Sequence, residues 1–357
     1  MRFLLNIILL SLISISCNNE VSSGLKAKLV ALGKMNEVVI VCDDDLWEGA
    51  IGDTTKYYFG SPYPLMPTPE PMFDMRHFST EELQAEQLRC QLRTYAIIAD
   101  LSDEDSPTTK MVRKDIGEEK YRQVMTGSGQ GSSIGRNKWA NGQILFYLFA
   151  DGQENLYSLI NKSYPAIAEA IHKHDSKQLK AKTYPRGVNL GVSEDLSLDY
   201  GMNIKIPSEY RIAKSVDAQS LYWFRKDDKK GIQNFVIQKI PYRAKEQFDT
   251  GKMIEACNAF GLAYVESDTE GSHLRINDKA LPILEYKYDI DGLYTKELRG
   301  VWEMTDDFMG GPFVAYLMQS KNESELVFIF SFVLAPGQDK KEMVQQLDYI
   351  VKSITIS

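Results

Sequence analysis

Two clusters of carboxylates contain the residue types that bind a cation or exchange protons. Asp43, Asp44 and Asp45 stand together with Glu48 one turn later, and four carboxylates lie between Asp100 and Asp105. Neither cluster has the Asp-x-Asp-x-Asp-Gly spacing of a calcium loop, and Asp is also a preferred residue at the start of a helix. Two interpretations therefore stay open: a hydrolytic or metal-dependent site near Asp43 or Asp103, and acidic loops that begin helices.

The other residues that could do chemistry show no catalytic spacing. Residues 127–133 are rich in glycine and serine but lack the Gly-Lys-Ser/Thr ending of a phosphate-binding loop. The four histidines form no zinc motif, and the chain has no Gly-x-Ser-x-Gly element. We therefore predict no catalytic residue, no metal site and no cofactor. The net charge of −8 also argues against a nucleic-acid partner.

Aromatic side chains are the better candidates for ligand binding. We predict that Trp47, Tyr63, Trp139 and Trp302 line a groove beside a stiff segment with five prolines between residues 62 and 71. Aromatic platforms with a few polar groups suit a peptide or a glycan, and a stiff segment loses little entropy on binding. The alternative is that the tryptophans pack inside sheets while the prolines protect an edge strand.

Two domains are expected to position these side chains. Apolar residues make up 43% of the chain, which is enough for substantial cores. Short apolar strands alternate with helices over residues 36–172, which predicts an α+β domain. Residues 173–188 are polar and basic and contain Pro185 and Gly187, so we interpret them as a linker.

Residues 189–357 are predicted to form a second α+β domain dominated by strands. The first of these strands covers residues 198–206, and Asp291-Gly292 marks a hairpin turn between two later ones. A final helix from about residue 339 to 354 has one apolar stripe that includes Ile350. Such a stripe must be buried, so we expect a curved antiparallel sheet with this helix packed on one face.

A strand-to-helix pattern occurs twice. Residues 149–154 and 334–339 both combine an apolar strand end with Ala-x-Gly-Gln and an acidic residue. The pattern is compatible with a duplicated unit and equally with a turn that arose twice.

The N-terminus has the features of a secretory signal. A short positive start precedes an apolar run over residues 3–15, which is too short to span a bilayer as a mature helix. Ser16-Cys17 followed by polar residues resembles a bacterial lipoprotein signal. That resemblance implies a signal peptide over residues 1–16, a lipid on Cys17, a tether over residues 17–35, and an anchor in the outer membrane facing the periplasm. Cys42, Cys90 and Cys257 remain, either as buried thiols or with Cys42 and Cys90 as a disulfide.

Longer resemblances cover most of the mature chain. Residues 198–213 resemble the opening of the PsbP-like fold. Residues 39–49, 57–78, 99–109 and 135–142 resemble an uncharacterised lipoprotein family of the Bacteroidota, domain-of-unknown-function family 4837. The family implies a cell-envelope lipoprotein and offers no catalytic residues to carry over. We therefore expect a non-catalytic binding or assembly protein whose partners are the membrane and an envelope protein, peptide or glycan, with an envelope hydrolase or metal-dependent enzyme as the alternative.

Overall fold

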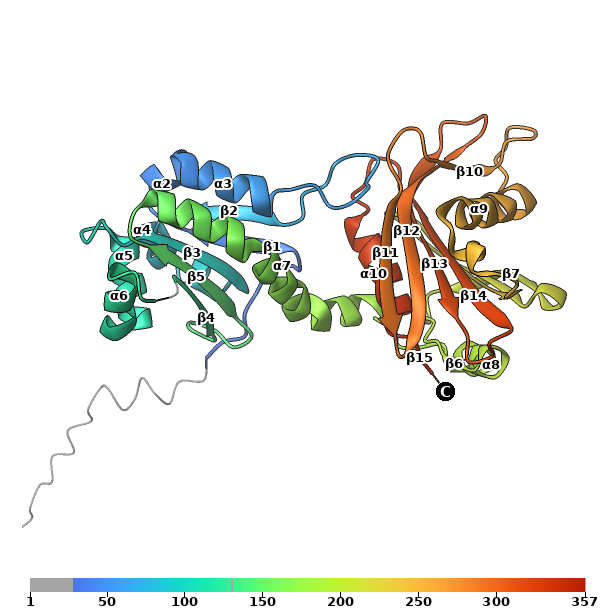
Figure 1. Cartoon of the computed structure of the whole chain (residues 1–357), viewed down its shortest axis with the longest axis horizontal. Helices are drawn as coiled ribbons and strands as arrows, with labels where there is room; N and C mark the ends of the chain where they lie inside the picture. Colours follow the sequence, from blue (N-terminus) through green and yellow to red (C-terminus); the bar gives the residue numbers. More distant parts are fainter. Residues whose placement is uncertain (1–27, 130, 357) are drawn as a thin grey trace, which may run out of the picture.

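The computed structural model describes residues 28–129 and 131–356, which form two domains joined side by side (Figure 1). The predicted signal peptide, Cys17 and the first part of the predicted tether lie outside the described residues. Residues 28–35 of that tether belong to the first domain instead. The amide of Ala31 donates to the carbonyl of Asn141 (2.8 Å), that of Leu32 donates to Gln91 (2.7 Å), and Met35 is buried. The tether prediction is therefore wrong for these eight positions. Their backbone pairs with the first domain, and the sequence of the segment does not show this pairing.

The sheet of the first domain is mostly parallel. Its order is β2-β1-β3-β5-β4, and only the edge strand β4 runs antiparallel. The bounds are β1 (Glu37–Val41), β2 (Asp74–Phe78), β3 (Thr94–Asp100), β4 (Ser132–Arg136) and β5 (Ile144–Ala150). β3 and β5 are buried along their whole length, as expected for central parallel strands covered on both faces.

Helices cover both faces of this sheet. One face packs against α3 (Ala50–Phe59), which follows the short α2 (Asp44–Glu48), and against α7 (Gln153–Thr183). The other packs against α4 (Thr80–Ala85), α5 (Pro107–Ile116) and α6 (Glu118–Met125). The predicted α+β class holds for the chain as a whole, and within it this domain has the three-layer α/β arrangement.

Helix α7 replaces most of the predicted linker. Residues 173–183 continue the helix, although Pro165 lies inside it. A proline inside a helix removes one backbone hydrogen bond, and its ring clashes with the carbonyl of the preceding turn. The helix continues nevertheless, because Ile160, Ile167 and Ile171 pack α7 against the sheet on both sides of Pro165. Asp175 and Thr183 are buried where α7 meets the second domain. The chain leaves the helix only at Tyr184, so the prediction of a linker over residues 173–188 was wrong for residues 173–183.

The second domain is a long, twisted antiparallel sheet (Figure 1). Its order is β10-β12-β13-β14-β9-β8-β7, and β11 also pairs with β12. The bounds are β7 (Arg211–Val216), β8 (Leu221–Asp228), β9 (Gly231–Pro241), β10 (Leu274–Asn277), β11 (Leu284–Ile290), β12 (Leu293–Met304), β13 (Gly310–Gln319) and β14 (Glu325–Leu334). Helix α10 (Lys341–Lys352) packs on one face and α9 (Thr250–Tyr264) on the other. The predicted curved sheet with a C-terminal helix on one face is confirmed.

The predicted strand over residues 198–206 was wrong. Residues 190–200 form helix α8 (Leu190–Tyr200), which leads into the short strand β6 (Met202–Asn203), and β6 pairs with β15 (Thr355–Ile356). Asn189 caps the helix by accepting a hydrogen bond from the amide of Val192 (3.3 Å), and Gly201 ends it in the left-handed conformation. The two caps favour a helix over residues 190–200, although the alternation of apolar residues predicts a strand from residue 198. They also remove the first part of the segment that resembled the PsbP-like fold.

The repeated strand-to-helix pattern joins different sheets. β5 leads into α7 from a parallel sheet, and β14 leads towards α10 from an antiparallel one. Gly152 and Gly337 both have positive φ, 85° and 68°. The two segments therefore share a glycine-dependent turn and no larger unit.

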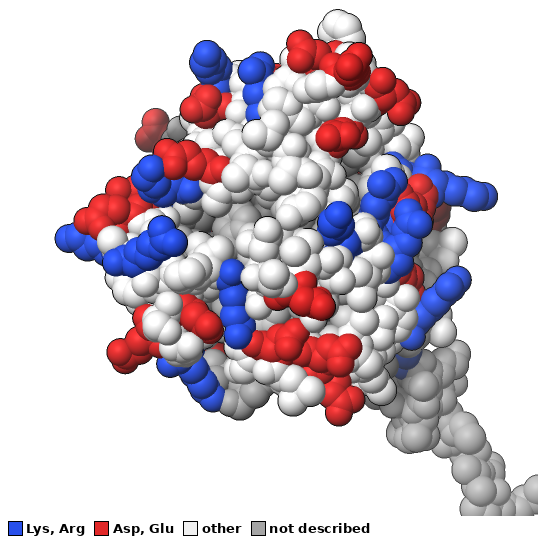
Figure 2. All heavy atoms as spheres, turned by 90° about the vertical axis from the view of Figure 1, so that its right-hand side faces the viewer, with Lys and Arg blue, Asp and Glu red and all other residues white. Residues whose placement is uncertain are grey.

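The surface of the second domain carries both signs of charge. Figure 2 shows acidic and basic side chains interspersed around an uncharged central area on this face, without a patch of one sign. Among the residues that the structure describes, no helix is both long and apolar enough to cross a membrane.

Candidate functional site at the domain junction

The first acidic cluster fixes a helix. Asp43 follows β1, and its two carboxylate oxygens accept hydrogen bonds from the hydroxyls of Ser106 (2.5 Å) and Thr108 (2.6 Å). Both hydroxyls lie at the N-terminus of α5, where a negative charge is favourable. The carboxylate of Asp43 thus occupies the place that an anionic ligand would take at the carboxyl edge of the parallel strands.

The second acidic cluster shapes loops. One oxygen of Asp100 accepts from the amides of Ser102 (3.0 Å) and Gly152 (2.9 Å), and Asp103 accepts from the amides of Asp105 (3.0 Å) and Ser106 (3.1 Å). In the part of the chain that the structure describes, no three His, Cys, Asp or Glu side chains are grouped to hold a metal ion. Among these residues the metal-dependent alternative therefore has no ready set of ligands.

The predicted aromatic residues do not meet in one groove. Trp47 stacks on His77 with 4.6 Å between ring centroids, and Trp139 packs edge-on against Tyr95 at 5.1 Å. Trp302 is only 4% exposed in the core of the second domain, where its Nε1 donates to the carbonyl of Val333 (3.2 Å). Burial removes Trp302 from any ligand surface, so that part of the prediction was wrong.

The cysteines are equally separate. Cys42, Cys90 and Cys257 are free thiols, and Cys42 and Cys257 are buried. Of the two alternatives, the Cys42–Cys90 disulfide is therefore wrong, and the interpretation of Cys42 and Cys257 as buried thiols holds.

Tyr63 belongs to a loop that joins the two domains. The proline-rich segment leaves α3, crosses to the second domain and returns to β2 (Figure 1). Tyr63 and Met66 are buried in the core of the second domain. A bridge between Pro62 and Pro71 and a hydrogen bond from the amide of Tyr63 to the carbonyl of Glu70 (2.7 Å) close the loop. The prolines stiffen an interdomain clamp, which neither sequence interpretation anticipated.

Glu70 attaches this clamp to the start of α10. Its two oxygens accept hydrogen bonds from the amides of Lys340 (2.7 Å) and Lys341 (2.8 Å), and the residue is 6% exposed. The ammonium of Lys341 in turn donates to the carbonyl of Pro71 (2.6 Å). A buried carboxylate is thus placed against the positive end of a helix, and it couples the loop of one domain to the helix of the other.

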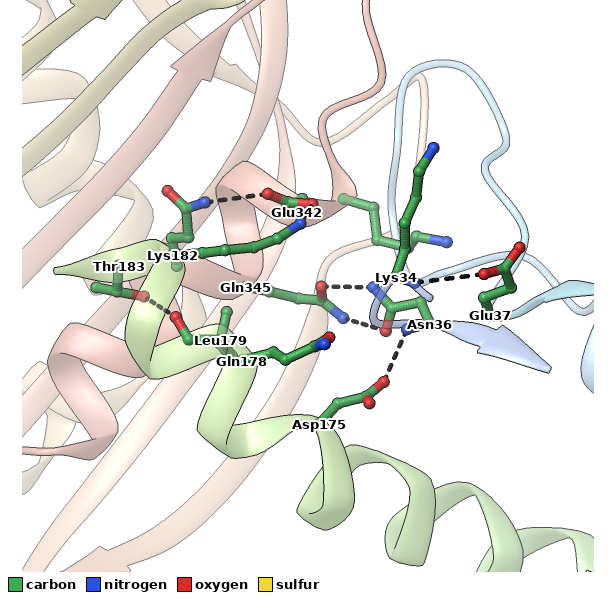
Figure 3. Close-up of polar contacts among 12 residues, drawn as sticks. Lys34, Asn36, Glu37, Asp175, Gln178, Leu179, Lys182, Thr183, Glu342 and Gln345 are labelled. Carbon is green, nitrogen blue, oxygen red and sulfur yellow. Dashed lines mark hydrogen bonds and ion pairs between the residues drawn. The ribbon is translucent and has the colours of Figure 1, made fainter. Parts of the chain in front are cut away.

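A second connection runs through buried amides (Figure 3). Arg93 pairs with Asp175 on α7 (3.1 Å), and Asp175 accepts from the backbone amide of Asn36 (2.8 Å). The side chains of Asn36 and Gln345 on α10 exchange two hydrogen bonds of 2.9 and 3.0 Å. Asn36 has φ of 61°, a conformation that Asn tolerates better than most residues. This chain of contacts links both domains, and nothing in the local sequence marks it.

A charged network lies under α10 on the sheet of the second domain. The guanidinium of Arg299 bonds to the carboxylates of Glu297 and Asp348, and the hydroxyl of Tyr316 donates to Asp348 (2.8 Å). Burial opposes the charge of Arg299, but the acidic groups around it, Asp348 first, together outweigh burial and hold the pKa of the guanidinium well above its ordinary value. Asp348 is thus held by both Arg299 and Tyr316.

A cavity of about 250 Å³ lies between these networks and is lined by both domains. The first domain contributes Tyr63, His172 and Leu179, and α10 contributes Tyr349 and Lys352. The remaining lining residues are the buried Met35 and four residues of the two networks, namely Asn36, Asp175, Gln345 and Asp348. A concave site at a domain interface with apolar and polar walls is typical of small-ligand sites.

Three polar side chains of this lining make few polar contacts. Among the described residues, His172 and Tyr349 have no side-chain hydrogen bond, and the closest charge to the Lys352 ammonium is Glu297 at 3.7 Å. Burial lowers the pKa of His172, helped by the positive charges of Lys341 and Lys352, so the imidazole is neutral at pH 7. Because Asp175 and Asp348 are already paired with arginines, the groups that remain to meet a ligand are the Lys352 ammonium, the Tyr349 hydroxyl and the neutral His172 imidazole. Such a set suits a carboxylate or another acceptor group.

Two families of unknown function match the chain. Residues 31–184 match the family described as Domain of unknown function (DUF8532), and residues 189–353 match Domain of unknown function (DUF4837). Family 4837 was predicted, but the segments that suggested it lie in the half that matches the other family. The gap between the two matches falls just after α7, where the structure places the domain boundary.

Other comparisons add little. A comparison with curated proteins gave no match. Among solved structures, LpqN of Mycobacterium tuberculosis, described as involved in cell envelope biogenesis, is similar with a TM-score of 0.27 and 10% identity. The similarity covers 44% of this chain and 83% of LpqN. At this TM-score it supports no argument about function.

Proposed function

We propose that this protein is a non-catalytic, lipid-anchored protein of the cell envelope that binds a small carboxylate-bearing ligand between its two domains. The anchor is a lipid on Cys17, and the domains face the periplasm from the outer membrane. The observation that carries the ligand proposal is the junction cavity. His172 and Tyr349 line it without a side-chain hydrogen bond among the described residues, and Lys352 adds an ammonium with one ion pair, to Glu297 at 3.7 Å.

The volume of the cavity limits the ligand. At about 250 Å³ it is slightly smaller than the ~300–1,000 Å³ of sites for drug-sized molecules. We therefore expect one acidic amino acid or one acidic sugar unit, either free or as the end of a peptide or glycan.

Binding without catalysis follows from the state of the reactive groups. Burial raises the pKa of the Cys42 and Cys257 thiols, so neither is a thiolate nucleophile at neutral pH. His172 has no carboxylate partner to orient it as a general base. The carboxylates at the cavity, Asp175 and Asp348, are held by Arg93 and Arg299.

The junction is also preorganised. The proline-rich clamp, the Glu70 contacts and the Asn36–Gln345 pair hold the two domains together at three places. A site that exists before binding avoids the free-energy cost of ordering its walls, which suits a ligand too small to close the domains by its own contacts.

Matched ligands test this proposal. Thermal unfolding of the lipidated protein in mild detergent is measured with glucuronate against glucose, and with acetyl-alanine against its amide. A ligand present at 100 times its Kd stabilises the folded state by about 2.7 kcal/mol, which raises Tm by roughly 5–10 °C for domains of this size. We expect a carboxylate to raise Tm while its neutral match does not.

Two variants locate the effect. Lys352→Met should abolish the shift, whereas Lys279→Met, an exposed lysine beyond β10, should keep it. The proposal is wrong if neither carboxylate exceeds its neutral match, or if the shift survives in Lys352→Met.

A further inference from the structure

Exposed apolar side chains gather near the point where the described chain begins. Among the described residues, fourteen large apolar side chains are exposed, and four of them are Leu29 (56%), Val30 (73%), Leu32 (51%) and Leu88 (66%). A monomeric soluble protein scatters such residues singly. Their concentration on this face calls for a partner.

Leu29, Val30 and Leu32 are held in place by backbone hydrogen bonds to the first domain. The amide of Asn141 donates to the carbonyl of Leu29 (2.8 Å), and the amide of Leu32 donates to Gln91 in the 3-10 helix Arg89–Gln91 (2.7 Å). Residues 28–32 therefore lie as a strap across the edge of the sheet where β3 and β5 begin. This strap and the neighbouring surface of the first domain line a shallow hollow that includes Leu29, Lys138 and Trp139.

The rim of the hollow has the composition of a membrane interface. The half-buried ring of Trp139 lies under the ammonium of Lys138 at 4.9 Å from the ring centroid. Lys28 lies beside it and donates to the carbonyls of Asn137 (2.6 Å) and Lys138 (3.1 Å). Tryptophan and lysine are favoured at the level of lipid headgroups, since each combines an apolar body with a polar end.

The length of the chain brings this face to the bilayer. Lys28 is eleven residues after Cys17. At ~3.3–3.6 Å per residue, even a fully extended segment keeps Lys28 within roughly 40 Å of an anchored Cys17. A surface held at this distance meets the bilayer at a high effective concentration.

We propose that the surface formed by Leu29, Val30, Leu32, Leu88 and Trp139, here termed the strap surface, rests on the lipid bilayer in which Cys17 is anchored. The inference rests on the lipid anchor of the proposed function. The occupant of the hollow is the headgroup and upper acyl region of the lipid. Contact at a second place, in addition to the lipid, fixes the orientation of the first domain at the bilayer.

Quenching by brominated lipids tests the contact. Full-length lipidated protein is reconstituted into phosphatidylethanolamine–phosphatidylglycerol vesicles with or without bromine on the upper acyl chains. The chain has four tryptophans. Trp302 is buried in the second domain, Trp223 is half-buried on β8 of that domain, and Trp47 follows β1 at the opposite end of the first domain's strands. We expect bromine-dependent loss of emission in the wild type and none in Trp139→Phe.

Matched variants separate contact from attachment. Leu29→Ser with Leu88→Ser should reduce the quenching at least twofold, while Leu190→Ser with Leu198→Ser, two exposed residues of α8, should leave it unchanged. Because all four side chains are exposed, these variants should keep the wild-type Tm.

Flotation distinguishes the two proposals. If the protein does not float with vesicles, the proposal of a lipid anchor on Cys17 is wrong. If it floats but shows no quenching, or if Trp139→Phe is quenched as much as the wild type, the strap surface does not touch lipid and the inference is wrong. A photoreactive group at position 88 that labels an envelope protein in cells instead of lipid would overturn it as well.

Discussion

Glu70 is the contact on which the junction depends most directly. In Glu70→Ala, the amides of Lys340 and Lys341 lose a charged acceptor at 2.7 and 2.8 Å inside a buried interface. An unsatisfied buried donor costs ~1–3 kcal/mol, and the loss of a helix cap costs ~0.5–2 kcal/mol. Water can reach one of the two amides after truncation, so we expect a loss of about 3 kcal/mol.

Calorimetry of the full-length protein measures this loss. Each kcal/mol moves Tm by roughly 2–4 °C in domains of 150–250 residues, so Tm should fall by about 6–12 °C. Glu70→Gln retains one acceptor oxygen and should fall about half as far. Glu81→Ala removes an exposed carboxylate from the first turn of α4 and should stay within ~0.5 kcal/mol of wild type.

Hydrogen exchange localises the effect. The first-turn amides of α10 should exchange faster in Glu70→Ala, while those of β3 in the first domain keep their protection. A Tm within the range of the Glu81→Ala control would refute the reasoning, because it would mean that the clamp does not hold α10.

Three further predictions concern the anchor, the core and the pH response. Cys17→Ala should move the protein from the membrane fraction to the soluble fraction, since the lipid is the proposed attachment; retention in the membrane would contradict it. Ile350→Asp places a charge in a position with 0% exposure under α10 and should cost several kcal/mol, so an unchanged Tm would show that the stripe is not buried. Because burial depresses the pKa of His172 in the folded state, its contribution to stability is present above its unfolded pKa and is lost as pH falls through the folded pKa. Lowering the pH from 7.5 to 5.5 should therefore destabilise the wild type more than His172→Asn, and equal slopes in the two proteins would contradict this.

Local patterns predicted the elements whose partners are sheet faces. The continuous apolar runs of β1, β3 and β5 indicate strands covered on both faces, and the apolar stripe of α10 indicates a helix covered on one, so each pattern predicts its own burial. The hairpin turn at Asp291-Gly292 was equally readable, since Asp291 and Gly292 have the positive φ that such a turn needs.

Contacts between the domains left no local pattern. Glu70 meets α10 across 270 residues, and Asn36 meets Gln345 across 309. The last turns of α7 look like a polar linker because only Asp175 and Thr183 are buried, and their burial depends on the second domain. The proline-rich segment drew attention to Tyr63 as a ligand-binding residue. In the structure, the stiff segment instead holds Tyr63 in the core of the second domain. His172, Tyr349 and Lys352 carry no motif, so only the fold brings them together.

The central claim is that the junction cavity holds a small carboxylate-bearing ligand. Native mass spectrometry of the lipidated protein, isolated from its own membranes in mild detergent, tests this most directly. We predict an adduct that contains an acidic amino acid or sugar unit, free or as the end of a peptide or glycan, on the wild type and on Lys279→Met, and its loss from Lys352→Met. A wild-type mass equal to that of the lipidated polypeptide alone, or an adduct that Lys352→Met retains, would contradict the claim.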